Sequence, residues 1–125
     1  MNNEIEIEIE IDGEIYVKKS SINLQTSHRS IDGLDYVIAR TYSAGVFAGY
    51  LKLKTGKEVT LINARRLWKF YSASLSQLAQ SGTPKPEECK FPEEVDNVIL
   101  TEVIEILSVT EEAKKTIDQV EIWKV

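Results

Sequence analysis

The fold is decided by residues 40–71, which read RTYSAGVFAGYLKLKTGKEVTLINARRLWKFY. Aromatic and β-branched residues, which favour strands, are joined here by small residues that let a ligand or another backbone come close. Thr55-Gly56 supplies a tight hairpin turn in the middle of the stretch. We therefore expect an antiparallel meander of about four or five strands. Its predicted strands are Asp35–Tyr42, Val46–Lys54, Lys57–Ile62 and Leu67–Tyr71, with Asn63–Arg66 as a polar interruption.

Strict alternation marks the chain before this stretch. From Glu4 to Ile11, isoleucines occupy one face and glutamates the other, which is the period of a half-buried strand. Asp12-Gly13 favours a type I′ turn into residues 14–18. Residues 1–18 are thus predicted to form an N-terminal β-hairpin with a solvated, acidic outer face, and residues 20–34 a long polar loop.

Two short helices are predicted after the meander. Ser74 can cap a helix that ends before Gly82, since glycine suits the position after a helix end. Thr110 can cap a second helix that runs to about Asp118, with acidic residues in its first turn. Both helices are short compared with the strands, so the fold is expected to be dominated by the sheet.

The segment Val95–Val109 is ambiguous, because its pattern fits either a strand or a helix. Its β-branched residues favour two strands with a bend at residues 100–102. Residues 120–125 are predicted as a last strand. The predicted fold class is α+β, a β-rich antiparallel meander with one or two short helices. It forms a single domain over residues 1–125, with a core of residues 35–125.

Composition excludes several functional classes. The chain has 125 residues, 42% of them apolar and 28% charged, as in a globular protein of one domain. Its net charge of −5 disfavours binding to bulk nucleic acid. No apolar run approaches the roughly 20 residues that span a bilayer, no signal peptide is evident, and a single cysteine fits a reducing compartment. We expect a cytoplasmic protein with no membrane partner.

Motifs for catalysis are missing from the sequence. His28 and Cys89 are the single residues of their kinds, and no cue pairs them with each other or with a serine. One histidine and one cysteine do not suffice for a zinc site within one chain. A glycine-rich phosphate loop is also missing. We therefore predict no catalytic residue, no metal ligand and no cofactor, and a protein that is not an enzyme.

Arg65 and Arg66 lie beside Trp68 and Phe70, a combination that suits a flat, anionic ligand. A guanidinium can grip a phosphate, and an aromatic ring can stack on a base. Adjacent strand residues point to opposite faces, so only one arginine can face a given pocket, and the sequence leaves open which one. The alternative roles are ion pairs with glutamates and packing in the core. Further candidate contacts for the ligand are Arg40, Tyr42, Ser43, His28 and Arg29.

Several motifs together resemble a family of small proteins encoded by phages and prophages. They lie between Val37 and Trp123: RTYSAGV at 40–46, Gly49, GKEV at 56–59, NARRLW at 63–68, and the closing stretch from Ile104-Glu105-Ile106 to Trp123. The chain is similar in these motifs to the Thoeris anti-defence sponge proteins, which bind cyclic ADP-ribose signals of bacterial immunity without cleaving them. Related sponges sequester cyclic di- and trinucleotides.

The resemblance implies a phage protein that sequesters a cyclic nucleotide immune signal, of the cyclic ADP-ribose type or a cyclic oligonucleotide, in the cytoplasm of a host bacterium. It also implies a homo-oligomer, of which a hexamer is one form, with ligands held at subunit interfaces. The residues fit this role, because a sponge needs arginines and aromatic faces but no acid–base pair. A phage structural or protein-interaction module is the alternative, and the identity of the signal and the number of subunits stay open.

Overall fold

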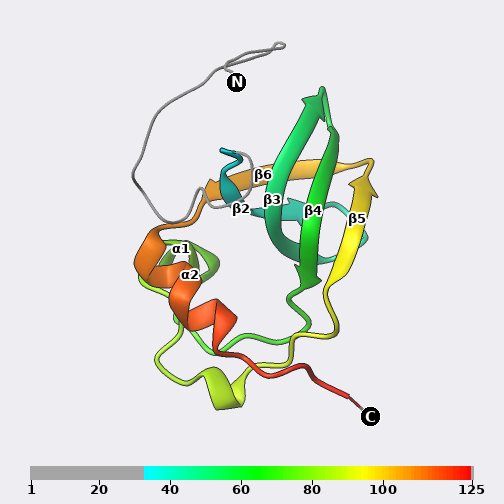
Figure 1. The fold of residues 1–125 in the computed structure, drawn as a ribbon. Helices are drawn as coiled ribbons and strands as arrows, with labels where there is room; N and C mark the ends of the chain where they lie inside the picture. Colours follow the sequence, from blue (N-terminus) through cyan, green and yellow to red (C-terminus); the bar gives the residue numbers. More distant parts are fainter. Residues whose placement is uncertain (1–32, 125) are drawn as a thin grey trace.

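Five antiparallel strands form one sheet in the computed structural model, which describes residues 33–124 (Figure 1). The strands are β2 (Tyr36–Thr41), β3 (Val46–Thr55), β4 (Glu58–Arg66), β5 (Val95–Leu100) and β6 (Val103–Ser108). The described residues also contain two short α-helices, α1 (Leu75–Gln80) and α2 (Glu111–Asp118), and a 3-10 turn, η1 (Pro86–Glu88). The α+β, β-rich fold class is confirmed. The hairpin predicted for residues 1–18 lies outside the described residues.

The sheet curls until its two edges meet at one corner. The strand order is β5-β4-β3-β2-β6, so β5 and β6 are opposite edges, although only Thr101 and Glu102 separate them in the chain. Two backbone hydrogen bonds hold this corner: the Tyr42 N–H donates to the Glu102 carbonyl (2.9 Å), and the Val103 N–H donates to the Lys57 carbonyl (3.0 Å). The interpretation of Val95–Val109 as two strands with a bend is therefore confirmed.

The sheet has a core on each face, because alternate residues of β2 point in opposite directions. Tyr36 and Ile38 face α1 and α2 and belong to what we call the helix-side core. The inner core consists of strand residues: Val37, Ala39, Phe47, Val59, Leu61, Ala64, Leu100 and Val103. Its members come from all five strands, both edges included, so the inner core fills the inside of the curl. Burial of each large apolar side chain contributes about 1.5–3 kcal/mol, and packing on both faces stabilises the curl.

Both helices have the predicted caps. The Gln77 N–H donates to the Ser74 hydroxyl oxygen (3.1 Å), and the Ala113 N–H donates to that of Thr110 (3.0 Å). Gly82 follows α1 with a φ of +85°, and a β-carbon there would collide with the hydroxyl oxygen of Thr116 in α2. Glycine is therefore needed after α1 both for its backbone and for the close packing of the helices.

The turn between β3 and β4 is shifted by one residue from its predicted position. Thr55 pairs with Glu58, so the two turn residues are Gly56 and Lys57. Gly56 has a φ of +60°, as the first central residue of a type II′ turn requires. β4 then continues through the predicted interruption to Arg66. It accommodates Asn63 at a φ of +50°, which asparagine tolerates better than most residues.

Two predicted strands are reduced to isolated bridges. Leu67–Tyr71 contributes only the bridge from Lys69 to Lys90, because β3 starts at Val46 and offers no partner beyond that point. The final stretch of the chain contributes only a bridge from Ile122 to Phe91, and Pro92, which has no N–H, cannot extend that ladder. Both strand predictions were therefore wrong.

Within residues 33–124, none of the helices has the length and apolar character to cross a membrane.

Candidate functional site

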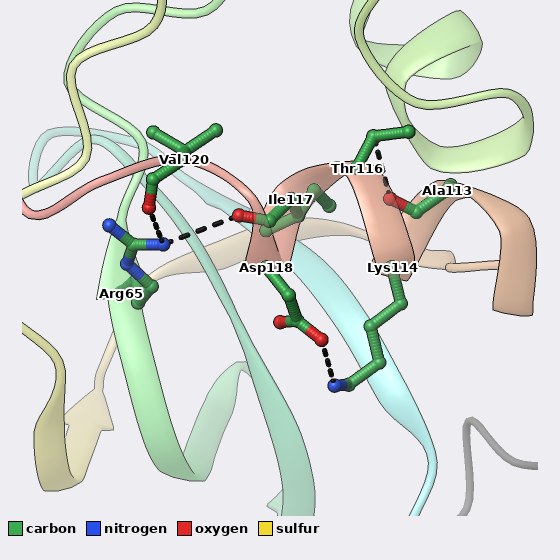
Figure 2. A network of polar contacts seen from close by, with 7 residues as sticks. All are labelled: Arg65, Ala113, Lys114, Thr116, Ile117, Asp118 and Val120. Atoms are coloured by element: carbon green, nitrogen blue, oxygen red, sulfur yellow. Dashed lines mark hydrogen bonds and ion pairs between the residues drawn. The ribbon is translucent and has the colours of Figure 1, made fainter. Parts of the chain in front are cut away.

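Arg65 and Arg66 point to opposite faces of β4, as their adjacency predicts. The Arg65 side chain is buried, with 8% of its surface exposed, and its guanidinium reaches between α2 and the segment before β5. Nη1 donates to the carbonyls of Val120 (3.0 Å) and Ile117 (3.3 Å), as Figure 2 shows. Nη2 donates to Phe91 (3.0 Å) and Nε to Pro92 (3.5 Å). Arg65 therefore joins two distant segments to the sheet.

This placement assigns Arg65 a structural role. The carbonyls at the end of a helix have no partners within the helix, and the negative end of the helix dipole lies there. A cation beside the end of α2 therefore donates to these carbonyls and interacts favourably with the dipole. Burial lowers the pKa of Arg65, and the nearby Tyr36, Glu94 and Asp118 partly offset that effect. The prediction that Arg65 contacts a ligand is therefore corrected. The alternative prediction was an ion pair with a glutamate, but the partners of Arg65 are backbone carbonyls.

Arg66 is exposed and lies against the turn between β2 and β3. Its guanidinium sits 4.4 Å from the centroid of the Phe47 ring and donates to the Ala44 carbonyl. That turn, residues 42–45, is called the 42–45 loop below. The Thr41 hydroxyl closes it by donating to the Gly45 carbonyl (2.7 Å) and accepting from the Ala44 N–H (2.9 Å). A cationic side chain is thus held over an aromatic ring beside a hydrogen-bonded loop.

Three other predicted contacts lie in or beside the same loop. Arg40 forms an ion pair with Glu105 of β6 (2.8 Å), and the Ser43 hydroxyl donates to the Glu102 carboxylate (3.3 Å). Tyr42 extends into solvent with 77% of its surface exposed. Exposed ion pairs such as that of Arg40 contribute little to stability, so this guanidinium can exchange its partner for a ligand at small cost.

Trp68 follows the last residue that pairs with β3. The Leu67 N–H donates to the Val46 carbonyl (2.8 Å), which continues the pairing of β4 with β3 by one residue. Trp68 comes directly after Leu67, as the 42–45 loop comes directly before Val46. The Trp68 ring is 64% exposed, yet it stacks on Trp123, with ring centroids 6.5 Å apart and planes 5° from parallel. We call Trp68 and Trp123 the tryptophan pair.

A lysine accompanies the tryptophan pair. The Lys90 ammonium lies 5.4 Å from the centroid of the Trp123 ring. Lys69 and Lys90 are joined by two backbone hydrogen bonds (3.1 and 2.7 Å), and the Trp123 N–H donates to the Phe91 carbonyl (3.0 Å). The backbone on both sides of the pair is therefore fixed, and the cationic and aromatic groups stand together at the surface.

The structure brings together only some of the residues selected from the sequence. Tyr42 and Ser43 belong to the 42–45 loop, Arg40 and Arg66 lie beside it, and Trp68 comes two residues after Arg66. Phe70 is half-buried and packs against the helix-side core. Core packing was the alternative that the sequence left open for this residue. His28 and Arg29 lie outside the described residues. Trp123 and Lys90 were missed, because the sequence placed them in a predicted strand and a loop with no cue that linked either to Trp68.

Two further groups with shifted pKa values lie in the helix-side core. Burial, followed by the charge of Asp118, raises the pKa of Tyr36 well above its usual range. Burial lowers the pKa of Lys114, but its hydrogen bond to Asp118 (2.8 Å, Figure 2) and the charge of that carboxylate outweigh the effect and raise it overall. The Lys114 ammonium lies over the Tyr36 and Tyr50 rings, at 4.9 and 5.6 Å from their centroids.

Over residues 33–124, no group of three or more His, Cys, Asp or Glu side chains is placed to hold a metal ion.

The raised pKa of Tyr36 predicts a loss of stability at alkaline pH. Above its ordinary pKa of about 10, the tyrosine ionises in the unfolded chain but stays protonated in the fold, so the unfolded state binds fewer protons. The free energy of unfolding should be unaffected by this group below pH ~10 and should fall by about 1.4 kcal/mol per pH unit above it. The raised pKa of Lys114 acts in the same direction.

Urea unfolding of the wild type and of Tyr36→Phe between neutral and alkaline pH checks this prediction. The variant should lose the part of the alkaline slope that belongs to Tyr36. Equal slopes for both proteins would show that Tyr36 does not cause the alkaline loss.

One protein-family model matches the chain. It is described as a domain of unknown function (DUF6948) and matches residues 34–117. No curated protein and no solved structure matches the chain. The matched part covers the whole sheet, with Arg66, Trp68 and the 42–45 loop, whereas Trp123 follows it.

Proposed function

Because the chain belongs to the DUF6948 family, a domain of unknown function, we propose its function from its own surface: it binds a flat, anionic ligand of the nucleotide class and releases it unchanged. The site is the surface that runs from the 42–45 loop over Arg66 to the tryptophan pair. The observation that carries the proposal is the Trp68 ring, which is largely exposed and nevertheless held parallel to Trp123.

An exposed aromatic plane of fixed orientation suits stacking on a base. Such a contact is worth about 1–3 kcal/mol per base, and it costs little side-chain entropy when the ring is already held. The Trp68 ring is held by its stack on Trp123, and the backbone of Trp123 is bonded to Phe91. A base on the free face of Trp68 would extend this stack.

Two cations belong to this surface and suit the phosphates of such a ligand. Lys90 lies on the side of Trp123, and Arg66 lies two residues before Trp68, with its guanidinium beside the 42–45 loop. An arginine can contact a phosphate with two parallel hydrogen bonds, whereas a lysine acts as a point charge. The net charge of −5 disfavours long nucleic acids, so a small ligand fits better than DNA or RNA.

The ligand we propose is a cyclic nucleotide immune signal, either of the cyclic ADP-ribose type or a cyclic oligonucleotide. The resemblance to phage anti-defence sponges supports this choice, together with host bacterial cytoplasm as the location. Sequestration needs binding alone, so the protein is proposed to act without catalysis. It is further proposed to work as a homo-oligomer, because a chain of this size has limited surface with which to enclose a dinucleotide.

A thermal-shift panel of cyclic ADP-ribose isomers and cyclic di- and trinucleotides tests the proposal. A ligand that binds only the folded protein stabilises it by about 2.7 kcal/mol at a hundredfold excess over Kd, which should raise Tm by roughly 10 °C. One member of the panel should produce this shift. If no member does, and a host protein is captured in a pull-down, the protein is an interaction module instead.

A further inference from the structure

We propose that β5 pairs with the β5 of a second copy of the chain, so that two sheets join across a two-fold axis. β5 is an edge of the sheet, and its only strand partner within residues 33–124 is β4. Among the described residues, no strand pairs with the other side of β5, so its backbone groups there can pair with a further strand. This inference locates the interface of the proposed homo-oligomer, and it does not depend on which ligand the tryptophan pair binds.

The β5 edge lacks the usual protection against pairing. Natural edge strands are blunted by lysines, prolines or bulges, but β5 reads VDNVIL and pairs with β4 without a register shift. Asp96 is its only charged residue. Two of its apolar side chains, Val95 and Ile99, are among the most exposed large hydrophobic residues of the described chain. A regular edge of six residues, four of them apolar, is suited to antiparallel addition of another strand.

The opposite edge, β6, is less suited to pairing. Its partner β2 has a register irregularity between Arg40 and Thr41, which bends the ladder on that side. Glu105 stands in the middle of β6, in its ion pair with Arg40. Each edge carries one acidic residue, Asp96 in β5 and Glu105 in β6, so the regular register of β5 is what distinguishes the two edges.

Charge favours an antiparallel, two-fold arrangement of two β5 strands. Acidic side chains gather at the start of β5: Glu93, Glu94 and Asp96. Its other end lies beside the tip of the β3–β4 hairpin, which extends past β5 (Figure 1) and carries Lys52, Lys54 and Lys57 against a single Glu58. A two-fold axis places the acidic end of each copy near the basic tip of the other, and the same contact occurs twice.

An apolar row crosses the sheet towards this edge. The register places Leu53 beside Thr60 and Thr60 beside Ile99, so these three side chains share one face of β3, β4 and β5. Leu53 is 60% exposed and Ile99 is 54% exposed. Pairing two β5 strands would bring the Ile99 side chains of both copies onto one continuous face and remove part of this apolar area from water.

Light scattering with size-exclusion chromatography at micromolar concentration tests the proposal. The wild type should show twice the chain mass of 14.2 kDa, or a multiple of that dimer. Ile99→Glu places an acid opposite the acidic start of the partner strand and should raise the dissociation constant at least tenfold, by about 1.4 kcal/mol. Ile104→Glu is the matched control, since Ile104 is a 48% exposed isoleucine on the β6 edge, and it should leave the mass unchanged.

A charge exchange provides a second test that leaves the apolar side chains intact. Lys57→Glu should weaken the dimer, and addition of Asp96→Lys should restore it, because the two charges then attract again. Circular dichroism confirms that each variant is folded. A wild-type monomer, or equal effects of Ile99→Glu and Ile104→Glu, would overturn the proposal. Ligand binding is then measured with the monomeric Ile99→Glu variant, which distinguishes a failure of this interface from a failure of the proposed function.

Discussion

Arg65→Met is expected to lower the free energy of unfolding by about 3–5 kcal/mol, whereas Arg66→Met, one residue away, should lower it by less than about 1 kcal/mol. The two arginines have the same chemistry and the same strand but opposite faces. Arg65 is buried and donates to carbonyls of Phe91, Pro92, Ile117 and Val120. Methionine fills a similar volume but removes all four of these hydrogen bonds. The Phe91 and Ile117 carbonyls keep the N–H groups of Trp123 and Val120 as donors, whereas the Val120 carbonyl loses the guanidinium.

The cost is large because Arg65 connects segments that are far apart in the sequence. Without its guanidinium, the end of α2 and the stretch before β5 lose their shared link to β4. Small domains have total stabilities of about 5–15 kcal/mol, so the loss would be a substantial fraction of the whole. Arg65→Lys should fall between wild type and Arg65→Met, because one ammonium cannot reach all four carbonyls in the planar geometry of a guanidinium.

Urea unfolding of the three variants beside the wild type measures these differences. Arg65→Met should shift the midpoint strongly and leave the slope unchanged, since the same surface is exposed on unfolding. Similar losses for Arg65→Met and Arg66→Met would contradict the structural role given to Arg65.

Trp68→Ala is expected to lower the affinity for the nucleotide-type ligand by roughly 10- to 100-fold, because it removes the stacking plane worth about 1–3 kcal/mol. Trp68→Phe keeps an aromatic face and should retain most of the affinity. Tyr71→Ala is the matched control, because Tyr71 is also an exposed ring with a lysine over it, Lys85 at 5.1 Å, but lies outside the proposed site. Isothermal titration calorimetry with the ligand found by thermal shift gives each affinity.

Trp123→Ala tests the same surface by removing the ring on which Trp68 stacks. Trp68 would keep its own ring but lose its partner, so a smaller loss of affinity than for Trp68→Ala is expected, through a less ordered stacking plane. Equal affinities for wild type, Trp68→Ala and Trp123→Ala would move the site away from the tryptophan pair, to Arg66, Arg40 and Tyr42 around the 42–45 loop.

Local signals in the sequence sufficed for most of the fold. Strand-favouring residues and turn signals predicted β2 and β3, adjacency on a strand predicted the opposite faces of Arg65 and Arg66, and the cap residues Ser74 and Thr110 predicted both helices. The errors occurred where pairing depends on a distant partner. Leu67–Tyr71 has strand-like residues, but β3 provides nothing for them to pair with, and no local pattern carries that information.

The candidate site was predictable in its residue types but not in its assembly. Which arginine is buried depends on carbonyls at Ile117 and Val120, about 50 residues further along the chain, and these enter only through tertiary packing. The same holds for Trp68, whose partner Trp123 comes from the end of the chain. From the sequence, Trp68 could be proposed as a stacking residue, but Trp123, which holds its ring, could not be identified.

The most direct test of the proposed function is mass spectrometry of the ligand released when the loaded protein is denatured. The wild type, incubated with the cyclic nucleotide that raises its Tm and freed of unbound ligand, should release that molecule with an unchanged mass, while Trp68→Ala treated in the same way should release far less. Recovery of a linear or hydrolysed product from the wild type, or equal amounts of intact ligand from both proteins, would contradict non-catalytic binding at the tryptophan pair.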